Sequence, residues 1–60
     1  MRSWDSVKVT NEALEHHGQA GRVVSAEPFI PEGEKAPHVE VQLDADGTSH
    51  LFEVTDLQVL

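Results

Sequence analysis

A chain of 60 residues holds one domain at most, near the lower size limit for independent folding. Apolar residues make up 38% of it and only three side chains are aromatic, which predicts a small and largely aliphatic core. Eleven acidic and four basic residues give a formal net charge of -7, and the few Lys and Arg residues are scattered, which argues against nucleic acid as a partner.

The chain has no cysteine, which excludes disulfides and thiolate metal sites. It also has no apolar run long enough for a signal peptide or a membrane span, so we expect a cytoplasmic protein without a membrane partner. A domain of this size gains only about 3–5 kcal/mol from its core, so association with a partner can add useful stability. We expect a monomer or a weak homo-oligomer.

The N-terminal part of the chain predicts one strand followed by a loop. Trp4, as a large apolar group, is expected to cap one end of the core. Residues 6–10 alternate polar and apolar side chains, as a half-buried strand does. Residues 11–18 are too few for a stable helix, so we expect a loop with at most one helical turn, from which Leu14 packs back onto the core.

Two glycines then mark the start of a second strand. Gly18 and Gly21 favour a tight loop, because glycine adopts positive φ without a steric penalty. Val23 and Val24 follow at once and favour a strand, which we place at residues 22–27.

A long loop and a third strand come next. Residues 28–37 contain several helix- and strand-breaking residues and predict a loop, with Phe29 and Ile30 at its root packed onto the core. Residues 38–43 alternate regularly and predict a strand whose outward face includes His38.

The third and fourth strands are predicted to form a hairpin. Asp46-Gly47 is typical of a two-residue hairpin turn, and the returning strand is expected at residues 48–54. This turn would set Val41 opposite Phe52 in the pairing.

The remaining residues complete a five-stranded pattern. Residues 55–57 predict a short turn and residues 58–60 a last strand. No predicted helix is long enough to cover a flat sheet, so the sheet must bend on itself to bury its apolar face. The predicted fold class is all-β, a small five-stranded SH3-like antiparallel barrel that forms a single domain over residues 1–60.

Two resemblances agree with this fold. The segment Gly18-Gln19-Ala20-Gly21-Arg22-Val23 resembles the KOW motif of ribosomal proteins and transcription-elongation factors, a family with an SH3-like barrel. That resemblance implies an RNA- or ribosome-associated protein, although the loops that contact nucleic acid in the family are rich in Lys and Arg. The runs Phe29-Ile30-Pro31, Val39-Glu40-Val41-Gln42-Leu43-Asp44 and Val54-Thr55-Asp56-Leu57 are similar to the barrel domain of nitrile hydratase β subunits, which implies a docking role without a metal ligand.

Four histidines offer the most specific chemistry in the chain. One helical turn would place Glu12 and His16 on the same face, which leaves a histidine metal-binding protein as an alternative. Because the adjacent side chains of His16 and His17 diverge, we expect them to be solvated and predict no metal and no cofactor. No motif for a nucleophile or an acid–base pair is present, so we do not expect an enzyme.

The leading prediction is a non-enzymatic protein-interaction or accessory module. Its contact surface would be the loops at residues 11–18 and 28–37, whose acidic rim suits a basic protein partner. The predicted interaction residues are Glu12, Glu15, His16, His17, Gly18, Gly21, Phe29, Ile30, Glu32 and Glu34.

Overall fold

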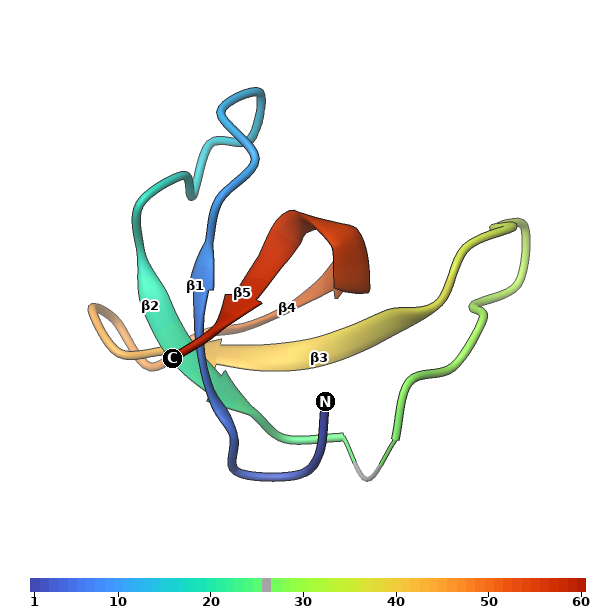
Figure 1. Ribbon diagram of the computed structural model, residues 1–60, viewed down its shortest axis with the longest axis horizontal. Helices are drawn as coiled ribbons and strands as arrows, with labels where there is room; N and C mark the ends of the chain where they lie inside the picture. The colour runs from blue at the N-terminus through green and yellow to red at the C-terminus, as the bar shows by residue number, and fades with distance from the viewer. Residues whose placement is uncertain (26) are drawn as a thin grey trace.

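The computed structural model describes residues 1–25 and 27–60. Within them lie five strands and one short 3₁₀ helix (Figure 1). These elements are β1 (Ser6–Val9), β2 (Ala20–Val23), β3 (His38–Leu43), β4 (Ser49–Glu53), η1 (Val54–Asp56) and β5 (Leu57–Val59). None of the described residues belongs to a helix that is long and apolar enough to cross a membrane.

The strands form one antiparallel sheet in the order β4-β3-β2-β1-β5. Figure 1 shows that β1 and β2 run steeply across β3 and that η1 turns the chain back toward β5. The predicted all-β, five-stranded antiparallel fold is therefore confirmed. Among the described residues the outer strands β4 and β5 do not pair, so the sheet is barrel-like without a closed ring of hydrogen bonds.

Alternate residues of the strands form the core. Because successive side chains of a strand point to opposite faces, one face of each strand can be wholly apolar. The buried apolar side chains are Val7, Val9, Val23, Val39, Val41, Leu43, Phe52 and Leu57. Met1, Leu14 and Val54 are partly buried against them, so Leu14 packs onto the core as predicted.

Gly21 lies within β2 rather than in the loop that the sequence predicted. It faces Leu43 of β3, and a Cβ atom at this position would overlap the carbonyl oxygen of Gln42. The absence of a side chain therefore lets β2 and β3 approach closely. Gly18 has φ of 87°, and a Cβ atom added there would meet no atom within 4 Å. Glycine therefore suits this position because of the backbone conformation of the turn before the strand, not because of a close contact.

The second strand lies nearer the N-terminus than the predicted range, residues 22–27. The observed strand begins at Ala20, because its pairing with Lys8 extends the ladder, and ends at Val23. Val24 still donates a backbone hydrogen bond to the Glu40 carbonyl at 2.8 Å. Ala26, which the prediction included, lies outside the described residues.

The predicted hairpin register is wrong by two residues. Val41 faces His50 rather than Phe52, because β3 and β4 are joined by the five residues 44–48 and not by a two-residue turn. The Gly47 amide donates to the Leu43 carbonyl at 2.9 Å and closes this loop. A shift of two residues leaves each side chain on its predicted face, so the core survives the error.

Trp4 does not cap the core. Its side chain is 69% exposed, and its backbone has φ of 70°, a left-handed conformation that is uncommon outside glycine. The Trp4 amide donates to the Val23 carbonyl at 2.6 Å, which fixes the turn before β1 and directs the indole outward.

Candidate functional site

An open cavity of about 430 Å³ lies where the aliphatic core ends. Its walls come from the loop at residues 11–18, the loop at residues 28–37, the start of β3, the strand β4 and η1. The lining residues are Leu14, Glu15, His16, Glu34, His38, His50, Leu51, Phe52, Glu53 and Asp56. Three imidazoles and four carboxylates thus line this cavity together with one aromatic ring, that of Phe52.

The base of the cavity is an aromatic cluster. His50 and Phe52 are two residues apart on β4 and so share a face, with ring centroids 6.3 Å apart. His16 approaches from the other side, 4.5 Å from the His50 ring and 6.0 Å from that of Phe52. The Nδ1 atom of His16 is buried and has no hydrogen-bond partner among the described residues.

The loop at residues 11–18 is fixed to η1, which explains how His16 reaches the cavity. The Asn11 side-chain amide donates to an Asp56 carboxylate oxygen at 2.8 Å, and its own carbonyl oxygen accepts from the Ala13 amide. Successive turns follow instead of a helix, with the His17 amide donating to the Leu14 carbonyl at 3.1 Å.

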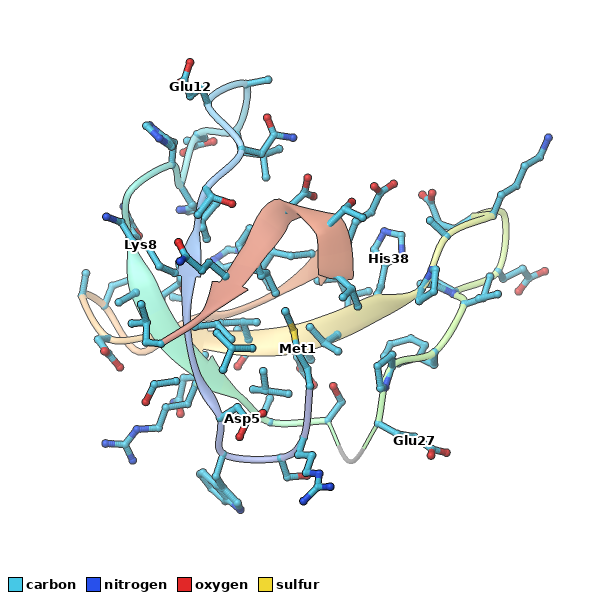
Figure 2. All side chains as sticks on the ribbon, in the orientation of Figure 1. Met1, Asp5, Lys8, Glu12, Glu27 and His38 are labelled. Carbon is cyan, nitrogen blue, oxygen red and sulfur yellow. The ribbon has the colours of Figure 1, made fainter. Side chains whose placement is uncertain are left out.

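These turns separate the residues that the sequence grouped as a metal site. Figure 2 shows Glu12 at the tip of the loop, directed away from the sheet. His17 is also exposed, whereas His16 is half-buried in the cavity. The predicted pairing of Glu12 with His16 depended on a helical turn, and none forms here.

The tautomer of His50 follows from its neighbours. The Thr48 hydroxyl donates its one proton to the Asp46 carboxylate at 2.7 Å, so it accepts from His50 Nε2 at 2.8 Å. We therefore assign the proton of neutral His50 to Nε2. The hydroxyl hydrogen bond, together with one from the Thr48 amide, lowers the pKa of Asp46 below its ordinary value.

His38 lies on the face of β3 opposite Val39, as the alternation predicted, but it is buried there rather than exposed to solvent. It is only 9% exposed, because a β-bridge to Phe29 folds the loop at residues 28–37 against the start of β3. Its Nδ1 atom lies 2.8 Å from the Ala36 carbonyl oxygen. Since a carbonyl only accepts, Nδ1 carries a proton, and in the neutral ring Nε2 is then the nitrogen with the lone pair. Figure 2 shows the ring between η1 and this loop.

One group of side chains in the described part of the chain has the composition of a metal site. Glu34, His38 and Glu53 each offer a ligand atom, and these atoms all lie within 4.8 Å of one another. Glu34 was predicted as a residue of the interaction surface, and neither His38 nor Glu53 was predicted as a metal ligand. The alternation of β4 and the four-residue spacing of Glu34 and His38 were visible, but the cross-strand register was not.

The predicted interaction residues are divided by the fold. Glu15, His16 and Glu34 line the cavity, whereas Phe29 and Ile30 lie at the surface with exposed fractions of 42% and 60%. The expectation that these two pack onto the core is wrong, because the β-bridge between Phe29 and His38 holds the loop beside β3 and outside the core.

Comparison with known proteins leaves the family of this chain open. No protein-family model, no curated protein and no solved structure matches it.

Proposed function

We propose that this chain is a non-enzymatic protein-interaction or accessory module whose contact surface is the loop at residues 28–37. The observation that carries the proposal is the exposure of Phe29 and Ile30, 42% and 60% respectively, in a loop that is tied to β3. Exposed apolar side chains on a well-defined backbone are typical centres of protein interfaces.

The backbone of this loop supports recognition without large ordering costs. Phe29 and His38 exchange two backbone hydrogen bonds, at 2.9 and 2.6 Å, and the Glu34 amide donates to the Pro31 carbonyl at 3.0 Å. A segment already held in one conformation loses less entropy when a partner binds.

The charge of the chain indicates the kind of partner. Glu32 and Glu34 are exposed beside the apolar pair, and the whole domain carries a net charge of -7. A partner with an apolar centre and a basic rim would complement this surface. The resemblance to docking barrels of nitrile hydratase β subunits points in the same direction.

The test compares two apolar side chains of similar exposure on different parts of the fold. Ile30→Ser removes the proposed contact, and Val59→Ser, at a side chain that is 50% exposed on β5, serves as the control. In a low-salt capture from cell lysate, we expect Ile30→Ser to lose the retained proteins and Val59→Ser to keep them. Equal loss in both variants, or no retained protein, would contradict the proposal.

An RNA-associated role of the KOW type is the second candidate, supported by the placement of two cations. Arg22 faces Ser6 across the β1–β2 ladder, and Lys8 lies two residues further along β1, so both exposed side chains share one face of the sheet. RNA binding at low salt that disappears in a Lys8→Gln, Arg22→Gln double variant would favour this role over the first.

A further inference from the structure

We propose that Glu34, His38 and Glu53 form a binding site for a divalent transition-metal ion such as Zn²⁺. One ligand atom from each residue lies within 4.8 Å of the other two. This group, called here the metal-ligand group, forms one wall of the cavity. It shares Glu34 with the proposed docking loop, but zinc binding is measured without a protein partner and so is tested separately from the docking role.

The fold brings the three residues together from two strands and a loop. His38 and Glu53 are direct partners in the β3–β4 ladder, so their side chains start on the same face of the sheet. Glu34 belongs to the loop at residues 28–37, which the bridge between Phe29 and His38 folds back beside the start of β3. The arrangement therefore follows from the backbone pairing as well as from side-chain rotamers.

A hydrogen bond orients the His38 ring in the way that is common for metal ligands. Metal-binding histidines commonly donate one ring N–H to a carbonyl or carboxylate, which orients the ring and leaves the other nitrogen free. His38 makes this contact from Nδ1 to the Ala36 carbonyl at 2.8 Å. The residue is 9% exposed, and no hydrogen bond to its Nε2 is found among the described residues. Unlike His16 Nδ1, this nitrogen is not fully enclosed, so an ion can reach it from the cavity. An oriented imidazole whose second nitrogen is accessible and lies within reach of two carboxylates is the observation that points to a cation.

The other histidines of the cavity are less suitable. His50 uses Nε2 to donate to Thr48, and its ring lies tilted against that of His16 at 4.5 Å, so the ring is engaged elsewhere. His16 is not part of the group whose ligand atoms lie within reach of one another. The metal-ligand group therefore holds one imidazole and two carboxylates.

The ligand set favours a transition-metal ion such as Zn²⁺ over Ca²⁺ and Mg²⁺. Imidazole nitrogen suits Zn²⁺, Cu²⁺, Ni²⁺ and Fe²⁺, whereas Ca²⁺ and Mg²⁺ prefer oxygen alone. Two carboxylates balance the charge of the ion, and tetrahedral Zn²⁺ would need its ligand atoms about 3.3 Å apart. Glu34 is exposed and can move the remaining distance, while the open cavity leaves space for water or a partner's side chain as a fourth ligand.

The experiment is a ZnCl₂ titration of the isotopically labelled protein, read from imidazole and backbone amide resonances. We expect saturable shifts at His38 Nε2 and at the amides of Glu34 and Glu53. Glu34→Gln should weaken binding roughly tenfold or more, because it removes a ligand charge without touching the core. Glu32→Gln is the matched control: it makes the same charge change in the same loop, outside the metal-ligand group, and should retain binding.

The outcomes separate a defined site from diffuse attraction of zinc to an acidic surface. Equal weakening by Glu34→Gln and Glu32→Gln would show such diffuse attraction and overturn the proposal. Shifts confined to His16, His17 or His50 would overturn it as well, and so would the absence of any saturable shift. Glu53→Gln provides a second ligand variant, whose folding is checked by its amide spectrum before zinc is added. Retained binding in both folded ligand variants would also overturn the assignment.

Discussion

The aliphatic core and the cavity are built on the same strands but differ in chemistry. Val39, Val41 and Leu43 of β3 are at most 1% exposed and pack against the valines of β1 and β2. At the start of the same strand, His38 is also buried but faces carboxylates. The change from packed aliphatic groups to imidazoles and acids occurs within one six-residue strand.

This difference shows where a small domain places its few apolar side chains. Eight buried apolar residues of the described chain, drawn from all five strands, form the core. The loops that extend past the strands add polar groups instead, and the end near β4 and η1 stays open to solvent. Binding sites are commonly found where packing is least complete, because stability and function compete for the same residues.

The largest expected difference between the two regions comes from truncating one leucine in each. Leu43→Ala removes a side chain that is 1% exposed and should lower the free energy of unfolding by about 2–5 kcal/mol, enough to unfold much of the protein. Leu14→Ala, at the partly buried rim of the cavity, should lower it by about 1 kcal/mol. Urea unfolding followed by circular dichroism measures both. Equal losses would mean that the cavity rim is as tightly packed as the core.

A smaller effect is expected from the two glycines near the start of β2. Gly21→Ala forces a Cβ against the Gln42 carbonyl and the Val41 side chain, which should lower the free energy of unfolding by about 3 kcal/mol. In Gly18→Ala the added Cβ meets no atom, so the only cost is strain in the left-handed backbone. This strain should lower the free energy of unfolding by about 1 kcal/mol.

Amide hydrogen exchange tests the cause of this difference. Gly21→Ala should accelerate exchange at Arg22 and Val23, whose strand must move away from β3. Gly18→Ala should affect mainly its own turn. A Gly21 variant as stable as the Gly18 variant would show that the close approach of β2 and β3 is not required.

The aliphatic core could be predicted from the sequence because it depends on a local signal. Strict alternation identified the inward faces of β1, β3 and β4, and these faces survived a register error of two residues. The close approach at Gly21 was not predicted, because the sequence shows the glycine but not the strand that lies over it.

The cavity could not be predicted in the same way, because it depends on long-range placement. Glu34, His38 and Glu53 come from a loop and two strands, and only the observed register sets the last two side by side. Alternation identified the face on which His38 lies but not its burial, because no sequence signal shows that a loop folds over the start of this strand. Phe29 and Ile30 were misplaced for the same reason.

The smallest expected effect concerns the hydrogen bonds through which Thr48 links Asp46 to His50. Thr48→Val removes the hydroxyl hydrogen bond that contributes most to the lowered pKa of Asp46, so this pKa should rise toward its ordinary value. A carboxylate with a lowered folded-state pKa adds stability above its unfolded pKa, and this contribution is lost as the pH falls through the folded value. Thr48→Val should therefore be less stable than the parent at neutral pH, and this difference in the free energy of unfolding should shrink as the pH falls through the folded-state pKa of Asp46.

NMR titration of the Asp46 carboxyl carbon measures the change in this pKa. Thr55→Val is the control, because the Thr55 hydroxyl donates to Glu53 instead. An unchanged Asp46 titration in Thr48→Val would contradict the hydrogen-bonded link, and with it the tautomer assigned to His50.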